Sequence, residues 1–258
     1  MAKVTRRKDK IIALVHERGE VSVVTLAERL GVSMQTIRRD LDDLCGSGLL
    51  MRRHGAVASP HQPVNAPYDQ RAATNPDYKW AIARAVAAEI PDGSSLFISI
   101  GTTPTIVAEA LKSKKNLTVI TNNLNAAMVL ASELSNRIII PGGEIRLPDR
   151  DLIGQDAIAF FDRYRADFGI FGVAGVAIDG TLLDFHAAEV AIREAIRTHS
   201  SVSLLVVDSS KFGRIAPAAG GNILEVDKVF MDRHSTEDFA PVLEQVSNRL
   251  VFVGGEVV

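Results

Sequence analysis

The sequence predicts an α/β protein, in which an N-terminal winged helix-turn-helix precedes a largely parallel sheet covered by helices. Three observations predict this fold class. Two short amphipathic helical stretches meet at a glycine-containing turn, residues 31–33. Three prolines then fall within residues 60–67 and mark an extended linker. From about residue 80, short apolar runs alternate with helical patterns, as in parallel sheets buried on both faces.

The predicted DNA-binding head covers residues 1–58. Residues 6–17 form its first helix, with an apolar face turned inward. Ser22 can cap a second helix, and Gly31 suits the left-handed geometry that ends it. Ser33 can cap a third helix. The apolar stripe of that third helix consists of Met34, Ile37, Leu41 and Leu44.

Polar side chains lie off this stripe, near the positively polarised end of the third helix. Amide, hydroxyl and guanidinium groups there can read base edges and hold phosphates. Taken alone, the helix could equally be an amphipathic helix with a solvated basic face. The preceding helices and a basic hairpin wing at residues 49–57 favour double-stranded DNA as the partner. The predicted DNA-binding residues are Ser33, Gln35, Thr36, Arg38, Arg39, Arg52, Arg53 and His54.

Charge and cysteine content bound the partners and the compartment. Residues 1–58 carry 11 Lys and Arg against 7 Asp and Glu, whereas the remainder carries 18 against 24. A basic head on an acidic body fits one DNA-binding part joined to a part that does not touch DNA. The single Cys45 allows no internal disulfide and fits a reducing cytosol. The longest uncharged apolar run, residues 168–178, is too short to span a bilayer, so we expect a cytoplasmic protein without a membrane partner.

A linker is expected at residues 59–79 and an α/β domain at residues 80–258. Helices are predicted at residues 82–90, 102–112, 125–135, 154–164, 186–199 and 236–248. Strands are predicted at residues 96–100, 117–121, 137–140, 167–173, 202–207, 226–231 and 250–253.

Ligands of such sheets bind beyond the carboxyl ends of the strands, and the candidate site residues lie there. Backbone N–H groups and small polar side chains at helix N-termini suit a phosphate, glycines allow close approach, and a lysine supplies charge. Each loop by itself could be an ordinary cap or turn, but four of them at successive strand ends favour an anionic ligand. These residues are Gly101, Thr102, Thr103, Thr121, Asn122, Asn123, Gly142, Gly143 and Lys211.

Several motifs resemble those of a known family. The head contains VSMQTIRRDLDDL and GLLMRRHGA, and the body contains IGTT, TNN, GGE, LIGQDA, GVAGVAIDGTLLDFHAAEV and DSSKFG. Together they resemble the DeoR family of bacterial transcription regulators. The resemblance implies an effector domain similar in fold to sugar-phosphate isomerases that binds a phosphorylated sugar or polyol. It also implies that Asp184, His186 and Glu189 bind ligand hydroxyls, although these residues could instead serve the first turn of the helix that follows.

The motifs VNAPYDQRAATN and VITNNLNAA are similar to those of family members that control glycerol use. This resemblance implies a repressor of glycerol or glycerol 3-phosphate metabolism, released from operator DNA by glycerol 3-phosphate. The alternative effector is another phosphorylated sugar or polyol. A symmetric dimer or higher homo-oligomer is expected, because one recognition helix covers only a few base pairs.

The alternative to a repressor is an isomerase. It would use a carboxylate base near a lysine, for which Asp184, Glu189 and Lys211 are candidates. Similarity of fold does not carry activity, and a catalytic domain has little use for a DNA-binding head. We therefore expect no enzyme and no catalytic residues. The six histidines lack the spacing of a metal site, so no metal and no cofactor are expected.

Overall fold

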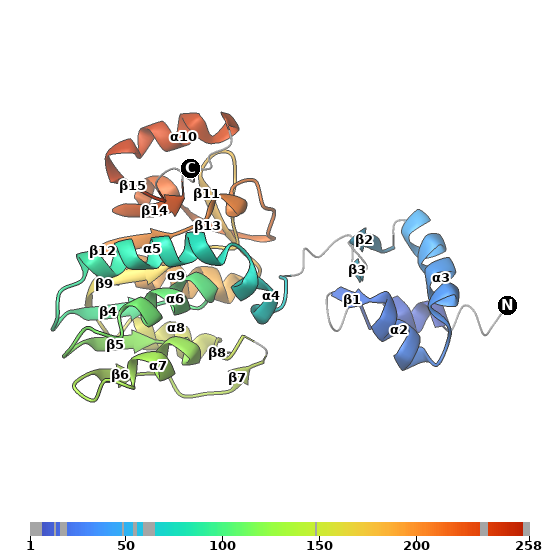
Figure 1. The fold of residues 1–258 in the computed structure, drawn as a ribbon, viewed down its shortest axis with the longest axis horizontal. Coiled ribbons are helices and arrows are strands. Elements are labelled where there is room, and N and C mark those ends of the chain that lie inside the picture. Colours follow the sequence, from blue (N-terminus) through green and yellow to red (C-terminus); the bar gives the residue numbers. More distant parts are fainter. Residues whose placement is uncertain are drawn as a thin grey trace. The chain divides into compact units, whose positions relative to one another are not determined.

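The chain divides into two compact units, Met1–Ala66 and Pro67–Val258. The computed structural model describes residues 7–12, 14–15, 20–47, 49–53, 56–58, 65–147, 149–232 and 237–254. Figure 1 shows the helices and strands of both units. Each unit has its own buried hydrophobic core.

The expected linker, residues 59–79, extends too far, because its second half is helical. Two helices of the second unit occupy it, α4 (Tyr68–Ala73) and the first turn of α5 (Pro76–Glu89). Asn75 separates them in a left-handed conformation, with φ of 51° and ψ of 47°. Pro76 then opens α5, where a fixed φ suits the helix and the missing N–H is not needed. The prolines that suggested a linker therefore end at Pro67, and Pro76 starts a helix.

The first unit is the predicted winged helix-turn-helix. Residues 7–12 and 14–15 are helical, and α2 (Val23–Leu30) and α3 (Met34–Gly46) follow. Gly31 ends α2 at φ of 63° and ψ of 38°, and its N–H bonds to the carbonyls of Ala27 and Glu28. An antiparallel sheet completes the unit, in the order β1 (Glu20–Ser22), β3 (Ala56–Ala58) and β2 (Met51–Arg53).

The core of the first unit differs from the predicted stripe at one residue. Ile37 and Leu41 of α3 are buried against Leu26 of α2, as the periodicity predicts. Met34, in contrast, is 46% exposed. It is the first residue of α3, and helical side chains lean toward the N-terminus, so it projects beyond the end of the core. Strand β1 was not predicted, because three residues are too few to show a period.

The second unit is built on a seven-stranded sheet in which every neighbouring pair is parallel. This confirms the predicted largely parallel sheet. In spatial order the strands are β15 (Leu250–Val253), β14 (Lys228–Asp232), β12 (Ser200–Val206), β9 (Ala166–Phe171), β4 (Ser95–Ile98), β5 (Thr118–Thr121) and β6 (Arg137–Ile139).

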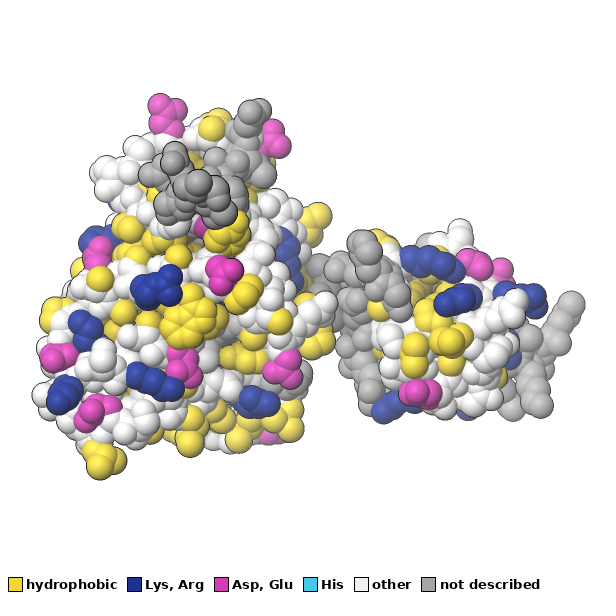
Figure 2. Space-filling view, viewed as in Figure 1, with side chains coloured by type: hydrophobic (Ala, Val, Ile, Leu, Met, Phe, Trp, Pro, Cys, Tyr) yellow, Lys and Arg dark blue, Asp and Glu magenta, His cyan; other side chains and the backbone are white. Residues whose placement is uncertain are grey.

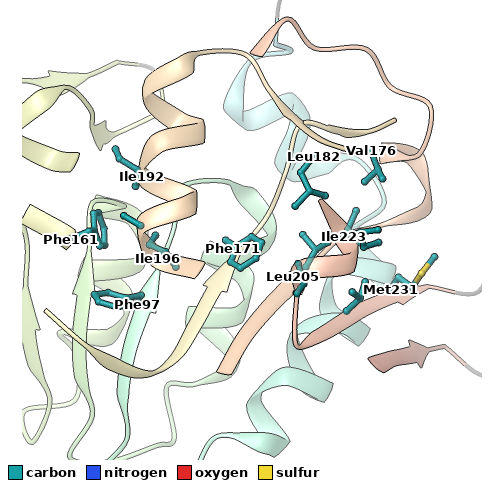
Figure 3. Packing of buried hydrophobic residues seen from close by; sticks show 14 of the residues in the cluster. Phe97, Phe161, Phe171, Val176, Leu182, Ile192, Ile196, Leu205, Ile223 and Met231 are labelled. Atoms are coloured by element: carbon teal, nitrogen blue, oxygen red, sulfur yellow. The ribbon is translucent and has the colours of Figure 1, made fainter. Parts of the chain in front are cut away.

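Helices cover both faces of this sheet. Helices α5, α6 (Thr102–Ala110) and α7 (Leu124–Leu130) pack on one face, and α8 (Gln155–Phe161), α9 (Ala187–His199) and α10 (Ala240–Gln245) on the other. Along β4, Leu96 and Ile98 belong to the core under α5, α6 and α7, whereas Phe97 belongs to the core under α8, α9 and α10. Figure 3 shows Phe97 beside Phe161 of α8 and Ile196 of α9. The near-continuous apolar strands therefore reflect burial on both faces.

Short antiparallel strands lie at the carboxyl edge of the sheet, and the sequence did not predict them. They are β7 (Ile145–Arg146), β8 (Asp151–Leu152), β10 (Gly175–Val176), β11 (Thr181–Asp184) and β13 (Ala218–Asn222). Single 3₁₀ turns are η1 (Ser209–Lys211), η2 (Ile223–Glu225), η3 (Glu237–Phe239) and η4 (Ser247–Arg249). In the described part of the chain, no helix is both long and apolar enough to cross a membrane.

Candidate DNA-binding surface and effector site

The exposed face of α3 carries side chains expected to bind DNA. The Ser33 hydroxyl accepts the backbone N–H of Thr36 at 3.2 Å and caps the helix, and the two hydroxyls also bond to each other at 2.9 Å. Gln35, Arg38 and Arg39 are exposed beyond this cap. Within the described residues, neither the Arg38 nor the Arg39 guanidinium has a hydrogen-bond or ion-pair partner. Such groups near an exposed helix N-terminus suit base edges and phosphates. Figure 2 shows Lys and Arg side chains on this unit.

The wing is the hairpin of β2 and β3, as predicted. Arg52 is exposed and pairs with Asp42 of α3, and it donates a further hydrogen bond to the Arg38 carbonyl at 3.4 Å. A surface ion pair of this kind contributes little, so a DNA phosphate can replace Asp42. The backbone of Arg53 belongs to β2, but its side chain and all of His54 lie outside the described residues.

Asp40 is a structural residue of the head that the sequence reasoning missed. It is 4% exposed, and its two oxygens accept hydrogen bonds from the Arg7 guanidinium at 2.5 and 3.0 Å. This hydrogen bonding raises the pKa of Arg7. The pair ties α3 to the first helix and so holds the recognition surface. The available signal was an acid next to the apolar stripe of α3.

In the second unit, the strand order reverses between β4 and β9. Strands β5 and β6 follow on one side of β4, and β9 and β12 lie on the other. Ligands of open α/β sheets bind at the carboxyl ends beside such a reversal. Gly172 follows β9, and a Cβ there would meet both Pro104 Cδ and the Val206 carbonyl at 3.5 Å. The start of α6 and the end of β12 therefore approach each other closely across β9.

The loop after β4 offers unused hydrogen-bond donors. Gly101 precedes α6 at φ of 119°, a conformation that suits glycine. The hydroxyls of Thr102 and Thr103 are largely buried and have no hydrogen-bond partner in the described structure. Their backbone N–H groups open the nine-residue helix α6, where intrahelical acceptors are lacking. This end of α6 suits an anion.

The side-chain donors of the loop after β5 already have partners within the protein. The Thr121 hydroxyl donates to the Ile98 carbonyl at 2.6 Å. The Asn123 amide donates to the Ser99 carbonyl at 3.1 Å and caps α7 through its oxygen. The Asn122 amide donates to the Leu152 carbonyl at 2.9 Å, and its Oδ1 is a buried acceptor without a partner among the described residues. These side chains fix the loop, and an orphan acceptor suits a ligand hydroxyl and not a phosphate oxygen.

Lys211 ends η1, the turn after β12, on the same edge of the sheet as Gly101. No described residue accepts a hydrogen bond from its ammonium. Burial lowers the pKa of Lys211 to about 8, and repulsion from Arg214 lowers it in the same direction, whereas Asp208 opposes the shift. A half-buried ammonium with unused donors beside other cations is suited to hold an anion.

A second lysine of this region was missed by the sequence reasoning. Lys79 lies in the first turn of α5, is 2% exposed, and donates a hydrogen bond to the Arg71 carbonyl. Burial lowers its pKa, the charge of Asp208 raises it, and that of Arg71 lowers it. Lys79 in turn helps to lower the pKa of Lys211, so the two ammonium groups lie in one electrostatic region. The signal was a lysine in register with the apolar stripe of α5.

The acids expected to bind ligand hydroxyls are engaged elsewhere. Asp184 accepts a hydrogen bond from Arg193 Nε at 2.9 Å, and burial raises its pKa to about 6. Glu189 binds Arg146 at 2.7 Å and accepts the N–H of His186 at 3.2 Å. For Glu189, these contacts match the alternative interpretation, in which the residue stabilises the first turn of the helix. His186 is the exposed N-cap residue of α9.

Gly142 and Gly143 follow the edge strand β6 and are exposed. Gly143 has a φ of 132°, so the turn itself requires a glycine there. Strand β5 separates this turn from β4 in the sheet. The geometry therefore favours a role for Gly142 and Gly143 in the turn over a role in letting the backbone approach a ligand.

Comparison with known proteins agrees with both units. Residues 7–63 match the DeoR-like helix-turn-helix domain, and residues 74–233 match the DeoR C-terminal sensor domain. The chain belongs to the DeoR family. It is 47% identical over 230 residues to the glycerol-3-phosphate regulon repressor of Escherichia coli, covering 89% of this chain and 91% of that protein. The repressor of the same name from Haemophilus influenzae is 41% identical and matches over 99% of both chains.

Among solved structures, the second unit of this DeoR protein is similar to ribose 5-phosphate isomerase A from Methanocaldococcus jannaschii. The TM-score is 0.39 at 16% identity, covering 54% of this chain and 55% of that chain. The structure of eIF2B delta from Chaetomium thermophilum matches with a TM-score of 0.45 at 13% identity, over 66% of this chain and 65% of that one.

Proposed function

We propose that this protein represses genes of glycerol or glycerol 3-phosphate metabolism and is released from operator DNA by glycerol 3-phosphate. The observation that carries the proposal is the cationic site of Lys79 and Lys211 in a chain 47% identical to a glycerol-3-phosphate regulon repressor. The exposed arginines of α3 support the DNA-binding part.

The chemistry of the site favours a phosphate ester. A phosphate monoester carries about −1.5 to −2 charge at pH 7 and accepts several hydrogen bonds. The N-terminus of α6 offers N–H groups and the hydroxyls of Thr102 and Thr103, and Lys211 offers the charge. The orphan Oδ1 of Asn122 can accept from a hydroxyl of the polyol part. A neutral polyol would leave the lysines uncompensated.

The carboxylates that could serve as a catalytic base support binding without turnover. An isomerase needs a carboxylate base that is free to take a proton. Asp184 is paired with Arg193, and Asp208 accepts a hydrogen bond from Asn75 at 3.2 Å. We therefore expect no conversion of ribose 5-phosphate, and measurable turnover in an aldose–ketose assay would contradict this.

The decisive experiment measures melting temperature and DNA release together. The DNA is a fragment that the protein selects from a random pool. The ligands are glycerol 3-phosphate, glycerol, ribose 5-phosphate and inorganic phosphate. We expect glycerol 3-phosphate to raise the melting temperature, because a ligand at a hundred times its Kd stabilises the native state by about 2.7 kcal/mol. It should also release the DNA, whereas glycerol should do neither.

The other outcomes separate the parts of the proposal. If a different phosphate ester gives both effects, the effector is that compound and the repressor mechanism stands. If glycerol acts as well as its phosphate, the anion site is misassigned. If none of the esters changes either quantity, the proposed effector function is wrong.

A further inference from the structure

Helix α4 contacts the rest of the second unit through hydrogen bonds and an ion pair. It is the first helix after the boundary between the units, and none of its six residues is buried. A helix this short is unstable by itself in water. Its order therefore depends on the groups that anchor its side chains and backbone.

Three contacts join α4 to α6, to the connection between β7 and β8, and to α5. The Tyr68 hydroxyl donates to the Thr105 hydroxyl, in the first turn of α6, at 3.1 Å. The Arg71 guanidinium pairs with Asp149, between β7 and β8. The Arg71 carbonyl accepts a hydrogen bond from Lys79. The contact from Lys79 joins α4 directly to a residue of the effector site.

The charges of this region oppose the docking of α4 when no anion is present. Burial lowers the pKa of Lys79 and of Lys211, and in both cases the positive charge of Arg71 lowers it further. Arg214 acts on both lysines in the same direction, so four cations repel one another, with Asp149 and Asp208 as their counter-charges. A dianion among them would turn this repulsion into attraction.

We infer that an anionic effector, held by Lys79 as well as Lys211, fixes α4 on the second unit and so transmits occupancy to the chain that leads to the DNA-binding unit. The inference rests on the proposed function, because it requires an anion at that site. It assigns Lys79 two roles, since one ammonium has three donors and can serve both the anion and the Arg71 carbonyl.

The test is amide hydrogen exchange of residues 68–74 in the full chain, with and without saturating glycerol 3-phosphate. We expect the ligand to slow exchange there by about tenfold or more, because docking then stabilises an exposed helix. Residues 190–198 of α9 serve as an internal control and should change less than twofold. Tyr68→Phe, which removes one anchor, should reduce the slowing while the ligand still raises the melting temperature.

A second arm needs no ligand. Lys211→Met removes one of the charges that repel Arg71, so exchange of α4 should slow by twofold or more in the ligand-free protein. Lys112→Met is the matched control, because Lys112 is exposed just after the C-terminal end of α6 and pairs with Glu109. It should leave α4 unchanged.

The outcomes distinguish this inference from the proposed function. If the ligand raises the melting temperature but leaves exchange of α4 unchanged, the inference is wrong and the proposed function stands. If none of the phosphate esters binds, the proposed function fails. In that case, equal exchange in Lys211→Met and wild type would also overturn the electrostatic control of α4.

Discussion

At the scale of single residues, Lys211 should decide how strongly the effector acts. Lys211→Ala should raise the effector concentration for half-release of DNA by about ten- to a hundredfold, since charge-assisted hydrogen bonds are worth about 1.5–3 kcal/mol. DNA binding without effector should be unchanged, because α3 belongs to the other unit. An operator complex titrated with glycerol 3-phosphate measures the midpoint. The same midpoint in mutant and wild type would make Lys211 an ordinary surface residue.

The same lysine predicts a pH dependence. Burial lowers the pKa of Lys211 to about 8, so the free protein loses this charge above that pH. A bound phosphate favours the charged form, so binding above pH 8 takes up a proton, and affinity falls as the pH rises. We expect up to about tenfold weaker binding per pH unit. Calorimetric titrations from pH 7 to 9.5 measure this, and Lys211→Met should show a flatter profile.

Arg39 of α3 and Arg52 of the wing strand β2 should behave differently. Arg39 is exposed and has no described partner, so it can contact a base, and a bidentate contact discriminates by about 1–3 kcal/mol. Arg39→Ala should therefore weaken binding to the selected operator much more than to random DNA. Arg52→Ala should weaken both alike and reduce the salt dependence, as loss of a phosphate contact does. Equal loss on both DNAs for Arg39→Ala would make Arg39 a phosphate contact too.

At the scale of elements, the cap of α7 holds the edge of the sheet together. Asn123 is 1% exposed, accepts the N–H of Ala126 at 3.1 Å and donates to the Ser99 carbonyl. Asn123→Ala should lower the free energy of unfolding of the second unit by about 2–3 kcal/mol, through loss of a cap and of buried hydrogen bonds. Urea unfolding measures this. Asn125→Ala, at a half-buried position of the same helix turn with one hydrogen bond to the Asp149 carbonyl, should change the midpoint less.

The elements also show what a sequence can predict. The ends of β4 and α6 were predicted to within three residues, because the apolar strand and the helical stripe each show a clear sequence pattern. Strands of two or three residues, such as β7 and β10, carry no period and form only through their partners. Helix α4 lacks an apolar stripe, so its sequence predicts a linker and not a helix.

The candidate site was predicted in part for the same reason. The position of Gly101 and Lys211 at strand ends follows from topology, which periodicity reveals. The engagement of Asn123 and the burial of Lys79 depend on contacts between distant segments. Neither can be predicted from the local sequence pattern, although a lysine on an apolar stripe indicates that its side chain is buried.

At the scale of the whole molecule, we expect a dimer formed through the second unit. Met128 and Leu147, each 75% exposed, line a groove of about 580 Å³ together with Glu109 and Arg150. Figure 2 shows hydrophobic side chains where α7 and β7 lie. In a twofold contact the acid of one copy can meet the arginine of the other. Met128→Glu should therefore produce monomers in sedimentation at micromolar concentration, whereas Leu134→Glu, outside the groove, should not.

A dimer also predicts the spacing of the half-sites in the operator DNA. Two recognition helices related by a twofold axis suit half-sites about 10–10.5 bp apart or multiples of that spacing. A wild-type monomer at micromolar concentration that still binds its operator one to one would contradict both parts.

The lack of buried residues in α4 also has a consequence for the lifetime of the protein. No Lys or Arg lies between Arg53 and Arg71 in the sequence, so trypsin can cut this stretch only at its two ends. Cleavage after Arg71 requires α4 to leave its docked position, and proteolysis of such an opened state follows its population. Limited digestion followed by mass spectrometry should show this cut, and saturating effector should slow it about as much as it slows amide exchange. A cell that runs out of effector would then hold repressor molecules that bind DNA well and are the first to be degraded.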